Sequence, residues 1–522
     1  MDKILILDYG SQYTQLIGRR VRAAGVYAEI IAGDSALDAG RLEGVRGIVL
    51  SGSPFSVYDG TAPRPDGRLW DLEVPILGIC YGAQRMTSDL GGRVEKLADR
   101  EYGRMRVDIE AKGDPLVSGL PASISTWMSH GDSISAVAPG FQVLARSEAG
   151  IPAIVRRGGR KQWGVQFHPE VSHCEGGPII VANFARSICG MEGSWSMEGY
   201  REEISRKLRD NTGDRDVLLL ISGGVDSSVA GALLLSALPP EKVWLLYIDT
   251  GLMRKDESLE VMRNLKGLGA RHLHMVDAGD EFLSALSGQA DPEAKRRIIG
   301  DLFMEVQKRE VERLGIPDSF LVQGTLYTDL IESGKGVGAK AQVIKSHHNV
   351  RSPLVEAKRG AGMIIEPLDR LYKDEVRELG RLLGLGSAIV DRHPFPGPGL
   401  AVRILGEVTR EACDLLREAD AVYLDELRSR GLYGKIWQAF SVLLPTRSVG
   451  VAGDERKYGR VLALRAVVSE DGMTAEPFAF DMKDLTGISA AITNRVPGIG
   501  RVVYDISSKP PATIEWELGM AS

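Results

Sequence analysis

The chain has 522 residues, too many for one ordinary hydrophobic core, so its length predicts two to four domains. Hydrophobic residues make up 43% and charged residues 26% of the chain, which is typical of a soluble globular enzyme, and no apolar run has the length of a membrane span. The net charge of −6 gives no overall attraction for nucleic acid, and four scattered cysteines indicate a reducing cytoplasm rather than a disulfide framework.

Short apolar segments alternate with helical stretches over the first part of the chain. The clearest predicted strands are Lys3–Leu7, Tyr27–Ile31, Gly47–Leu50 and Pro75–Ile79. This βαβ alternation predicts a doubly wound α/β domain with a mainly parallel sheet over residues 1–192. A Gly-rich stretch, 190–199, then interrupts the pattern and indicates a linker.

A second doubly wound, mainly parallel α/β domain is predicted over residues 193–395. Its strands are Val217–Ile221, Val243–Ile248, Arg271–Val276 and Phe320–Gln323. A Gly- and Lys-rich segment at about 333–365 is expected to form a lid.

The proline-rich run His393–Leu400 marks the next boundary, because proline lacks an amide donor and fixes φ. A small α+β domain is predicted over residues 396–522. Its expected strands include Arg501–Ile506 and Ala512–Glu517, which show period-two patterns.

A candidate cysteine nucleophile follows the strand Pro75–Ile79. Cys80 stands between Gly78 and Gly82 and before a helix, an arrangement that exposes a nucleophile at the edge of a sheet. His168 is the candidate base and Glu170, two residues further on, can orient it if the chain is extended there. Taken alone, Cys80 could be a buried structural cysteine and His168 could be a turn histidine.

These residues, with the turn Leu50–Pro54, resemble the class I glutamine amidotransferases. The resemblance implies that Cys80 is the nucleophile, His168 the base and Glu170 its orienting partner. It also implies an oxyanion hole near Gly52 and the Tyr81 amide, although this chain has Ser53 where relatives usually have a second glycine.

A glycine loop follows the strand Val217–Ile221 and precedes a helix. Its backbone amides, its hydroxyls and the helix N-terminus predict a phosphate-binding loop. The loop is neither a Walker A motif nor a dinucleotide fingerprint. Its residues are Ser222, Gly223, Gly224, Val225, Asp226, Ser227 and Ser228.

The complete loop resembles the N-type ATP pyrophosphatases, which implies ATP as co-substrate, cleaved between its α- and β-phosphates. Asp226 is a candidate ligand of Mg²⁺, since this cation prefers carboxylate and phosphate oxygens. The alternative role for Asp226 is a helix N-cap.

Four further segments resemble the GMP synthetase family, so that the likeness spans essentially the whole chain. They are 323–333, 344–349, 392–403 and 501–517. The resemblance implies glutamine, ATP and xanthosine monophosphate (XMP) as small-molecule substrates, no nucleic-acid or membrane partner, and a homodimer formed by the C-terminal domain.

The resemblance also implies residues for the nucleotide substrate. XMP would be held by Arg296, Pro396, Gly397, Pro398, Gln438, Arg501, Lys509 and Glu515. Asp329, Glu332 and Lys345 would lie near ATP, Mg²⁺ or the adenylylated intermediate. For Arg501 and Glu515 the alternative is a solvated strand face.

Other functions remain open from the sequence. Another glutamine-dependent adenylylating enzyme, such as an NAD synthetase, would share both motifs. A catalytically silent scaffold would keep the folds but has no need for Cys80, His168 and Glu170. A tRNA-thiolating enzyme would be expected to show a basic RNA-binding face or cysteine pairs, which this sequence lacks.

Overall fold

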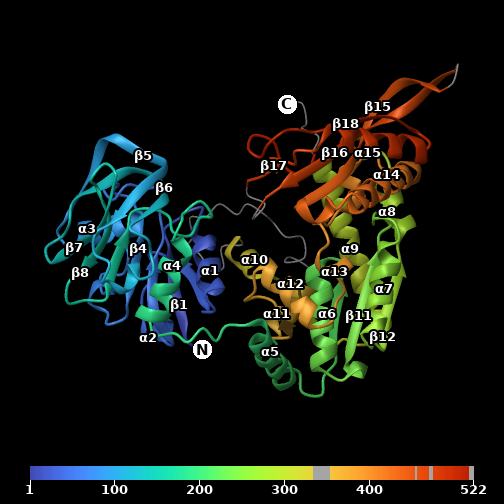
Figure 1. Ribbon diagram of the computed structural model, residues 1–522. Coiled ribbons are helices and arrows are strands. Elements are labelled where there is room, and N and C mark those ends of the chain that lie inside the picture. Colours follow the sequence, from blue (N-terminus) through green and yellow to red (C-terminus); the bar gives the residue numbers. More distant parts are fainter. Residues whose placement is uncertain (333–352, 453–454, 470–473, 517–522) are drawn as a thin grey trace. The chain divides into compact units, whose positions relative to one another are not determined.

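The computed structural model describes residues 1–332, 353–452, 455–469 and 474–516 (Figure 1). Over these residues the chain forms two compact units. The first contains residues 1–200 with 327–332, and the second contains residues 201–326 with the described residues from 353 onward. In these ranges no helix is both long and apolar enough to cross a membrane. Most of the expected lid, residues 333–352, lies outside the described part of the chain.

The first unit is built on a sheet with the strand order β2-β1-β3-β4-β9-β8-β7-β5-β6. The elements of this unit, in chain order, are β1 (Lys3–Asp8), α1 (Thr14–Ala23), β2 (Ala28–Ala32), α2 (Ala39–Leu42), β3 (Val45–Leu50), β4 (Ile76–Ile79), α3 (Tyr81–Asp89), β5 (Arg93–Ile109), β6 (Ser123–Ala136), β7 (Phe141–Ser147), β8 (Pro152–Arg157), β9 (Gln162–Val165), α4 (Gly177–Ala182) and α10 (Tyr327–Glu332). Helix α5 (Met197–Thr212) follows residue 190 and begins near the boundary of the units.

The parallel half of this sheet agrees with the predicted βαβ pattern. Strands β2, β1, β3, β4 and β9 pair in parallel. Strands β8, β7, β5 and β6 extend the sheet with antiparallel pairs, an extension that the sequence analysis did not predict. The sheet is therefore mixed, but every strand predicted in this domain lies in its parallel half.

The second unit contains a parallel sheet with the order β12-β11-β10-β13-β14. The elements around it are β10 (Val217–Ile221), α6 (Val225–Ala237), β11 (Val243–Asp249), α7 (Glu257–Gly267), β12 (His272–Asp277), α8 (Gly279–Ala285), α9 (Pro292–Leu314), β13 (Phe320–Val322), α11 (Pro353–Gly360), β14 (Ile364–Ile365), α12 (Lys373–Leu382) and α13 (Ser387–Val390).

Both faces of this sheet are covered, as expected of a doubly wound fold. A Cβ on Gly231 of α6 would lie 3.3 Å from Ile221 and 3.5 Å from Leu219, so these side chains face α6. Leu218 points to the opposite face, where it joins one hydrophobic cluster with residues of α9 and of the C-terminal sheet. The segment predicted as a separate C-terminal domain thus shares a core with the parallel sheet.

The C-terminal α+β region has helices packed against a small sheet (Figure 1). Its elements are a 3₁₀ turn (Gly399–Arg403), α14 (Arg410–Ser429), β15 (Gln438–Ala452), β16 (Glu455–Val468), β17 (Glu476–Pro477), α15 (Met482–Arg495) and β18 (Ile499–Tyr504). Strand β18 pairs in parallel with β16, close to the predicted strand Arg501–Ile506.

The predicted strand Ala512–Glu517 is wrong, because residues 512–516 are irregular. These residues bond instead to a buried side chain. The Arg465 guanidinium donates to the carbonyls of Ser507 at 2.6 Å and Thr513 at 3.3 Å, so the chain wraps around this cation. Pro510 and Pro511 supply no amide to a strand ladder.

A buried lysine connects α9 to the turn after the proline-rich segment. The Lys295 ammonium donates to the carbonyls of Ala401 (3.1 Å), Ile404 (2.8 Å) and Gly406 (2.7 Å). Its side chain is buried, and this burial lowers the pKa of Lys295 to about 8.

We expect Lys295→Met to destabilise the second unit by about 2–5 kcal/mol, because three carbonyls would lose their shared donor. The measurement is urea denaturation followed by circular dichroism. Lys308→Met is the matched control, since Lys308 is exposed on the same helix, and it should change stability by less than about 0.5 kcal/mol. Equal unfolding midpoints for the two variants would contradict this structural role.

Candidate active sites

The candidate residues of the first unit follow three neighbouring parallel strands. Gly52 comes after β3, Cys80 directly after β4 and His168 after β9, and these strands are adjacent in the sheet. The carboxyl ends of parallel strands lie at the same edge of a sheet, where ligand sites of α/β folds form. The topology therefore brings together residues far apart in the sequence.

Cys80 occupies a sharp turn between β4 and α3. Its backbone has φ 51°, in the left-handed region that non-glycine residues rarely adopt. The turn depends on the glycines beside it: a Cβ on Gly78 would lie 2.6 Å from the Ala83 nitrogen, and one on Gly82 would lie 2.6 Å from the Leu50 carbonyl oxygen. The predicted elbow around Cys80 is thus present, and close backbone packing explains its glycines.

His168 and Glu170 form the pair that the sequence analysis predicted. The His168 Nδ1 lies 2.7 Å from the Glu170 Oε1, and both side chains are buried. The other carboxylate oxygen, Oε2, is buried without a hydrogen-bond partner within the described ranges. Tyr13 packs edge-on against the imidazole at 5.1 Å, which helps to fix the ring plane.

The charges around His168 favour its protonated form. Burial by itself disfavours the cation, but the charges of Glu170 and Cys80, and hydrogen bonds to both side chains, raise the pKa of His168 well above its ordinary value. The imidazole of His168 interacts with the Cys80 side chain as well as with Glu170. The three side chains are thus arranged as a Cys-His-Glu constellation.

Backbone amides near Cys80 can form the predicted oxyanion hole. Tyr81 is the first residue of α3, so its amide belongs to the unpaired donors of a helix N-terminus. Gly52 lies next to the imidazole, because a Cβ there would be 3.1 Å from the His168 Cε1. A side chain at position 52 would therefore crowd the base.

The phosphate-loop candidate lies at the carboxyl edge of the second sheet. Residues 222–224 follow β10 and lead into α6. The chain runs from β10 outward to β11 and β12, then returns to β13 on the other side of β10, so the loop stands at the topological switch point. Gly223 has φ +78°, which only glycine adopts readily.

Asp226 lies in the first turn of α6, not at the N-cap position, which Gly224 occupies. The Lys373 ammonium lies 2.6 Å from each Asp226 carboxylate oxygen. Mg²⁺ commonly binds through one carboxylate together with substrate phosphates, so a single acid at the loop fits that cation. Across the described part of the chain, no cluster of three or more ligating side chains offers a metal site of its own.

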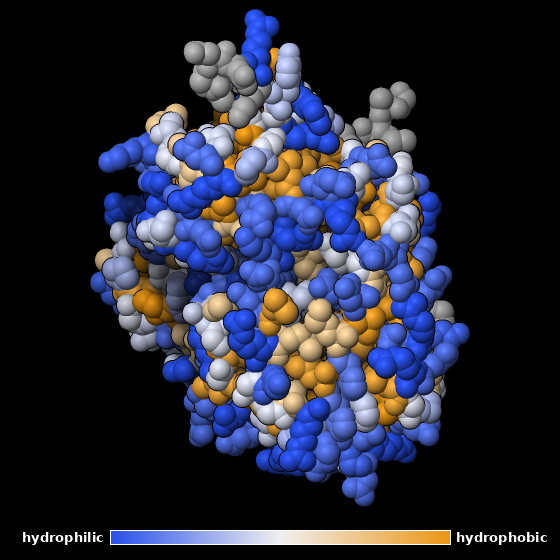
Figure 2. Space-filling view, turned by 90° about the vertical axis from the view of Figure 1, so that its right-hand side faces the viewer, coloured by the Kyte–Doolittle hydropathy of each residue, from blue (hydrophilic) through white to orange (hydrophobic). Residues whose placement is uncertain are grey.

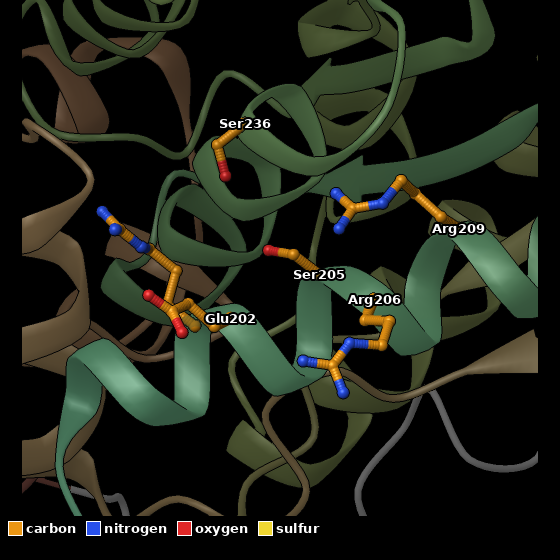
Figure 3. A pocket seen from close by; sticks show the side chains of 6 residues that line it. Glu202, Ser205, Arg206, Arg209 and Ser236 are labelled. Atoms are coloured by element: carbon orange, nitrogen blue, oxygen red, sulfur yellow. The ribbon is translucent and has the colours of Figure 1, made fainter.

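The described surface of the second unit has at least two hollows. One, of about 380 Å³, is lined by Asp249, Gly251, Asp277 and Gly279 at the carboxyl ends of β11 and β12, and reaches Glu257 beside the phosphate loop. The other, of about 460 Å³, lies between α5 and the end of α6 (Figure 3). The residues lining it are Arg201, Glu202, Ser205, Arg206, Arg209 and Ser236. None of the predicted site residues lines this second hollow.

Two of the residues predicted to hold the nucleotide substrate are in contact. The Gln438 amide donates to the Glu515 carboxylate at 2.8 Å and to the Pro394 carbonyl at 3.2 Å. Arg403, which is fully buried, donates to both oxygens of Glu515 at 3.1 and 2.9 Å. Glu515 is therefore not on a solvated strand face.

The structure places the other predicted residues less closely together. Arg296 pairs with Glu293 at 2.6 Å on α9, and the Lys509 backbone bridges to Ala475. Arg501 is exposed on β18 and bonds to the Ser448 hydroxyl at 2.8 Å. Asp329 lies on α10, whereas the Glu332 side chain and Lys345 fall outside what the structure describes.

Three functional candidates were missed by sequence reasoning: Lys373, Arg392 and Arg403. Each is identified by a long-range contact, to Asp226, Gly223 and Glu515 respectively. Arg392 and Arg403 stand at the two ends of the segment 392–403 that carried the family resemblance, which was the only local signal for them.

The fold and the two sites define an amidotransferase-type cysteine unit joined to a phosphate-loop synthetase unit. Residues 5–188 match the family Glutamine amidotransferase class-I, and residues 425–516 match the GMP synthase C terminal domain. Proteins named "GMP synthase [glutamine-hydrolyzing]" from Rhizobium etli, Brucella suis and Rhizobium rhizogenes are 49%, 49% and 50% identical to this chain. Each of these matches covers 99% of both chains. The chain belongs to the family of glutamine-hydrolysing GMP synthases.

We expect iodoacetamide at pH 7 to modify Cys80 and to spare the other cysteines. Burial raises the pKa of Cys174 and Cys189 to about 12 and that of Cys413 to about 11, so these thiols stay protonated. Peptide mass spectrometry measures the site and rate of modification. His168→Ala should slow modification about tenfold, because the cation beside the sulfur is lost. Modification spread over all four cysteines, or an unchanged rate in His168→Ala, would contradict this assignment.

Proposed function

We propose that the chain makes GMP from XMP, ATP, glutamine and water, and releases glutamate, AMP and pyrophosphate. The observation that carries the proposal is the presence, in one chain, of a Cys-His-Glu constellation and a phosphate loop, each at the carboxyl edge of its own parallel sheet. Full-length similarity to GMP synthases supports this choice of acceptor over that of an NAD synthetase.

In the first unit, Cys80 attacks the side-chain amide carbon of glutamine. The amides of Gly52 and Tyr81 stabilise the oxyanion, and His168, oriented by Glu170, gives a proton to the departing ammonia. Water, deprotonated by His168, then hydrolyses the thioester to glutamate and restores the Cys80 thiol. The net products of this half-reaction are ammonia and glutamate.

In the second unit, residues 222–228 hold the β- and γ-phosphates of ATP. The C2 oxygen of XMP attacks the α-phosphorus, the bond to the β-phosphate oxygen breaks, and pyrophosphate leaves with its electron pair. Ammonia then adds at C2, the added nitrogen loses one proton to solvent, and AMP departs with the electron pair of the C2–O bond, which leaves the amino group of GMP. Adenylylation is needed because an amide-like oxygen is otherwise a poor leaving group.

Mg²⁺ bound with ATP would supply positive charge for the leaving pyrophosphate, and Asp226 would hold it. The Lys373 ammonium neutralises Asp226, and it would contact phosphate oxygens once the cation had taken its place at the carboxylate. Gln438 and Glu515 would hold the polar edge of the purine, beside residues 396–398. Arg296, Arg501 and Lys509 would serve the phosphate of XMP, and Asp329, Glu332 and Lys345 the activated intermediate.

We further propose that the enzyme acts in the cytoplasm, where Cys80 remains a free thiol, and that it forms a homodimer through the C-terminal sheet. Val449 and Tyr458 are paired across β15 and β16, and both side chains are exposed. Figure 2 shows one face of the molecule, on which hydrophobic residues lie in the upper part and also further down. Ile506, 75% exposed, follows the neighbouring strand β18.

The dimer proposal predicts that the purified chain sediments at twice its monomer mass of 56.6 kDa. Val449→Asp should shift the equilibrium toward monomer, because a carboxylate would be buried in the proposed interface. Leu259→Asp is the control, since Leu259 is an exposed apolar residue on α7 and is not part of the C-terminal sheet. A wild-type monomer at micromolar concentration would rule the dimer out.

We expect Cys80→Ala to abolish GMP formation from glutamine, by at least about a thousandfold, and to leave formation from ammonium salts near the wild-type rate. The reason is that the thiol acts only in releasing ammonia. The assay measures GMP, AMP and pyrophosphate from ATP, Mg²⁺ and XMP with either nitrogen donor.

The reciprocal control is Asp226→Asn, which should lower the rate with both donors. Equal loss with glutamine and ammonium in Cys80→Ala would contradict the division of labour. Release of ADP and phosphate by the wild type would contradict the proposed reaction itself.

A further inference from the structure

Arg392 connects the phosphate loop to the segment 393–398 that precedes the 3₁₀ turn. Its guanidinium donates to the Gly223 carbonyl at 2.9 Å and pairs with the Glu257 carboxylate. Both charged groups are largely buried, with side-chain exposures of 16% and 4%. A buried, charge-assisted contact of this kind is stronger and more directional than a surface ion pair.

The contact with Gly223 sets the direction of a loop amide. In a trans peptide the carbonyl of one residue and the N–H of the next point in opposite directions. Because Arg392 holds the Gly223 carbonyl on one side, the Gly224 N–H points to the other. There it lies 3.4 Å from the Ser222 hydroxyl, inside the loop formed with Ser227.

The Glu257 carboxylate also lies against Gly223. A Cβ on Gly223 would lie 3.2 Å from the Glu257 Oε1, so the loop rests directly on this carboxylate. The second oxygen, Oε2, accepts the Arg254 amide at 3.1 Å and so cannot rotate freely. Arg392 and Glu257 together fix the first part of the loop.

The Arg392 guanidinium also faces the segment 393–398, which contains the prolines predicted to contact XMP. This guanidinium lies 5.9 Å from the centre of the Phe395 ring, and those of Arg254 and Arg403 lie 4.7 and 4.9 Å from it. Arg403 in turn holds Glu515. A short, continuous chain of contacts thus runs from the Gly223 peptide through Phe395 to Glu515.

The segment itself is held rigidly at its first residue. The Ala439 amide donates to the His393 Nδ1 at 3.1 Å, so Nε2 carries the hydrogen that the Tyr433 carbonyl accepts at 3.0 Å. Burial lowers the pKa of His393 to about 4, which keeps this arrangement neutral and intact near pH 7. His393 is therefore a fixed point of the backbone, and a displacement of residues 394–398 reaches Arg392 through the Phe395 ring that its guanidinium faces.

We infer that Arg392 is a positioning residue that couples the two substrate sites of the second unit, by aiming the Gly224 amide at the ATP phosphates only while the segment 394–398 holds its place. The identity of the two ligands rests on the proposed function. The coupling itself is a property of the contacts among Gly223, Glu257, Arg392 and Phe395.

Calorimetric titration of the full-length protein with α,β-methylene-ATP and Mg²⁺, with and without XMP, tests this inference. In the wild type, XMP should tighten binding of the analogue severalfold. In Arg392→Lys a single ammonium replaces the planar guanidinium and cannot contact Gly223 and Glu257 in the same way. The variant should therefore bind the analogue about tenfold more weakly and lose the effect of XMP. In turnover with ammonium, the KM values for ATP and XMP should both rise.

The matched control is Arg381→Lys, because Arg381 forms an exposed ion pair with Asp391 next to the same segment. It should bind the analogue as the wild type does. A variant that is merely less well folded would lose active fraction and kcat but keep its KM values.

An affinity and an XMP effect in Arg392→Lys within about twofold of the wild type would overturn the inference. If that variant does not fold, Glu257→Gln decides in its place, with weaker analogue binding supporting the inference and wild-type binding opposing it. Analogue binding does not require catalysis. If the wild type binds the analogue but makes no GMP, the proposed function is refuted. The comparison of analogue binding between the wild type and Arg392→Lys then still decides whether Arg392 positions the loop.

Discussion

Both candidate sites depend on one constraint: a parallel strand must end in a tight glycine turn so that a helix can begin with its free amides facing the site. Those amides and the helix dipole favour negative charge. In the proposed reactions this charge would be the oxyanion beside Tyr81 in the first unit and a phosphate of ATP in the second. The glycines at 78, 82 and 223 are required by packing or by φ, so the local sequence at each turn follows from this single requirement.

In the second unit several guanidinium groups lie near one another, and their mutual electrostatic repulsion must be offset. Arg254, Arg392 and Arg403 surround the Phe395 ring, and each has its own carboxylate: Asp420 for Arg254, Glu257 for Arg392 and Glu515 for Arg403. An aromatic face and a matched acid offset much of the cost of removing each cation from water. The arrangement fixes the segment 393–398 from several sides, together with the bond that the Pro394 carbonyl accepts from the Gln438 amide.

The sequence predicted best those parts of the candidate sites whose residues lie close together along the chain. Cys80 between two glycines, the His168–Glu170 spacing and the loop 222–228 could be recognised because all the necessary residues lie within a few positions. The pairs Asp226–Lys373 and Glu515–Arg403 could not, because more than a hundred residues separate their members. Likewise, the long strands β5 and β6 were not predicted, because polar and charged residues interrupt their apolar positions. The supposed strand at 512–517 failed because buried Arg465 binds carbonyls that a sheet would otherwise use.

The order of the proposed chemistry explains why the two substrate sites of the second unit should be coupled. ATP bound without XMP has only water as an acceptor, so a loop fully organised in that state would favour wasteful hydrolysis. If XMP strengthens ATP binding through Arg392, thermodynamic linkage requires ATP to strengthen XMP binding by the same factor. The productive ternary complex is then favoured over either binary complex, and no additional gating element is needed. On this proposal a single buried guanidinium would provide the preference, because Arg392 contacts the loop directly and faces the Phe395 ring of the segment 393–398.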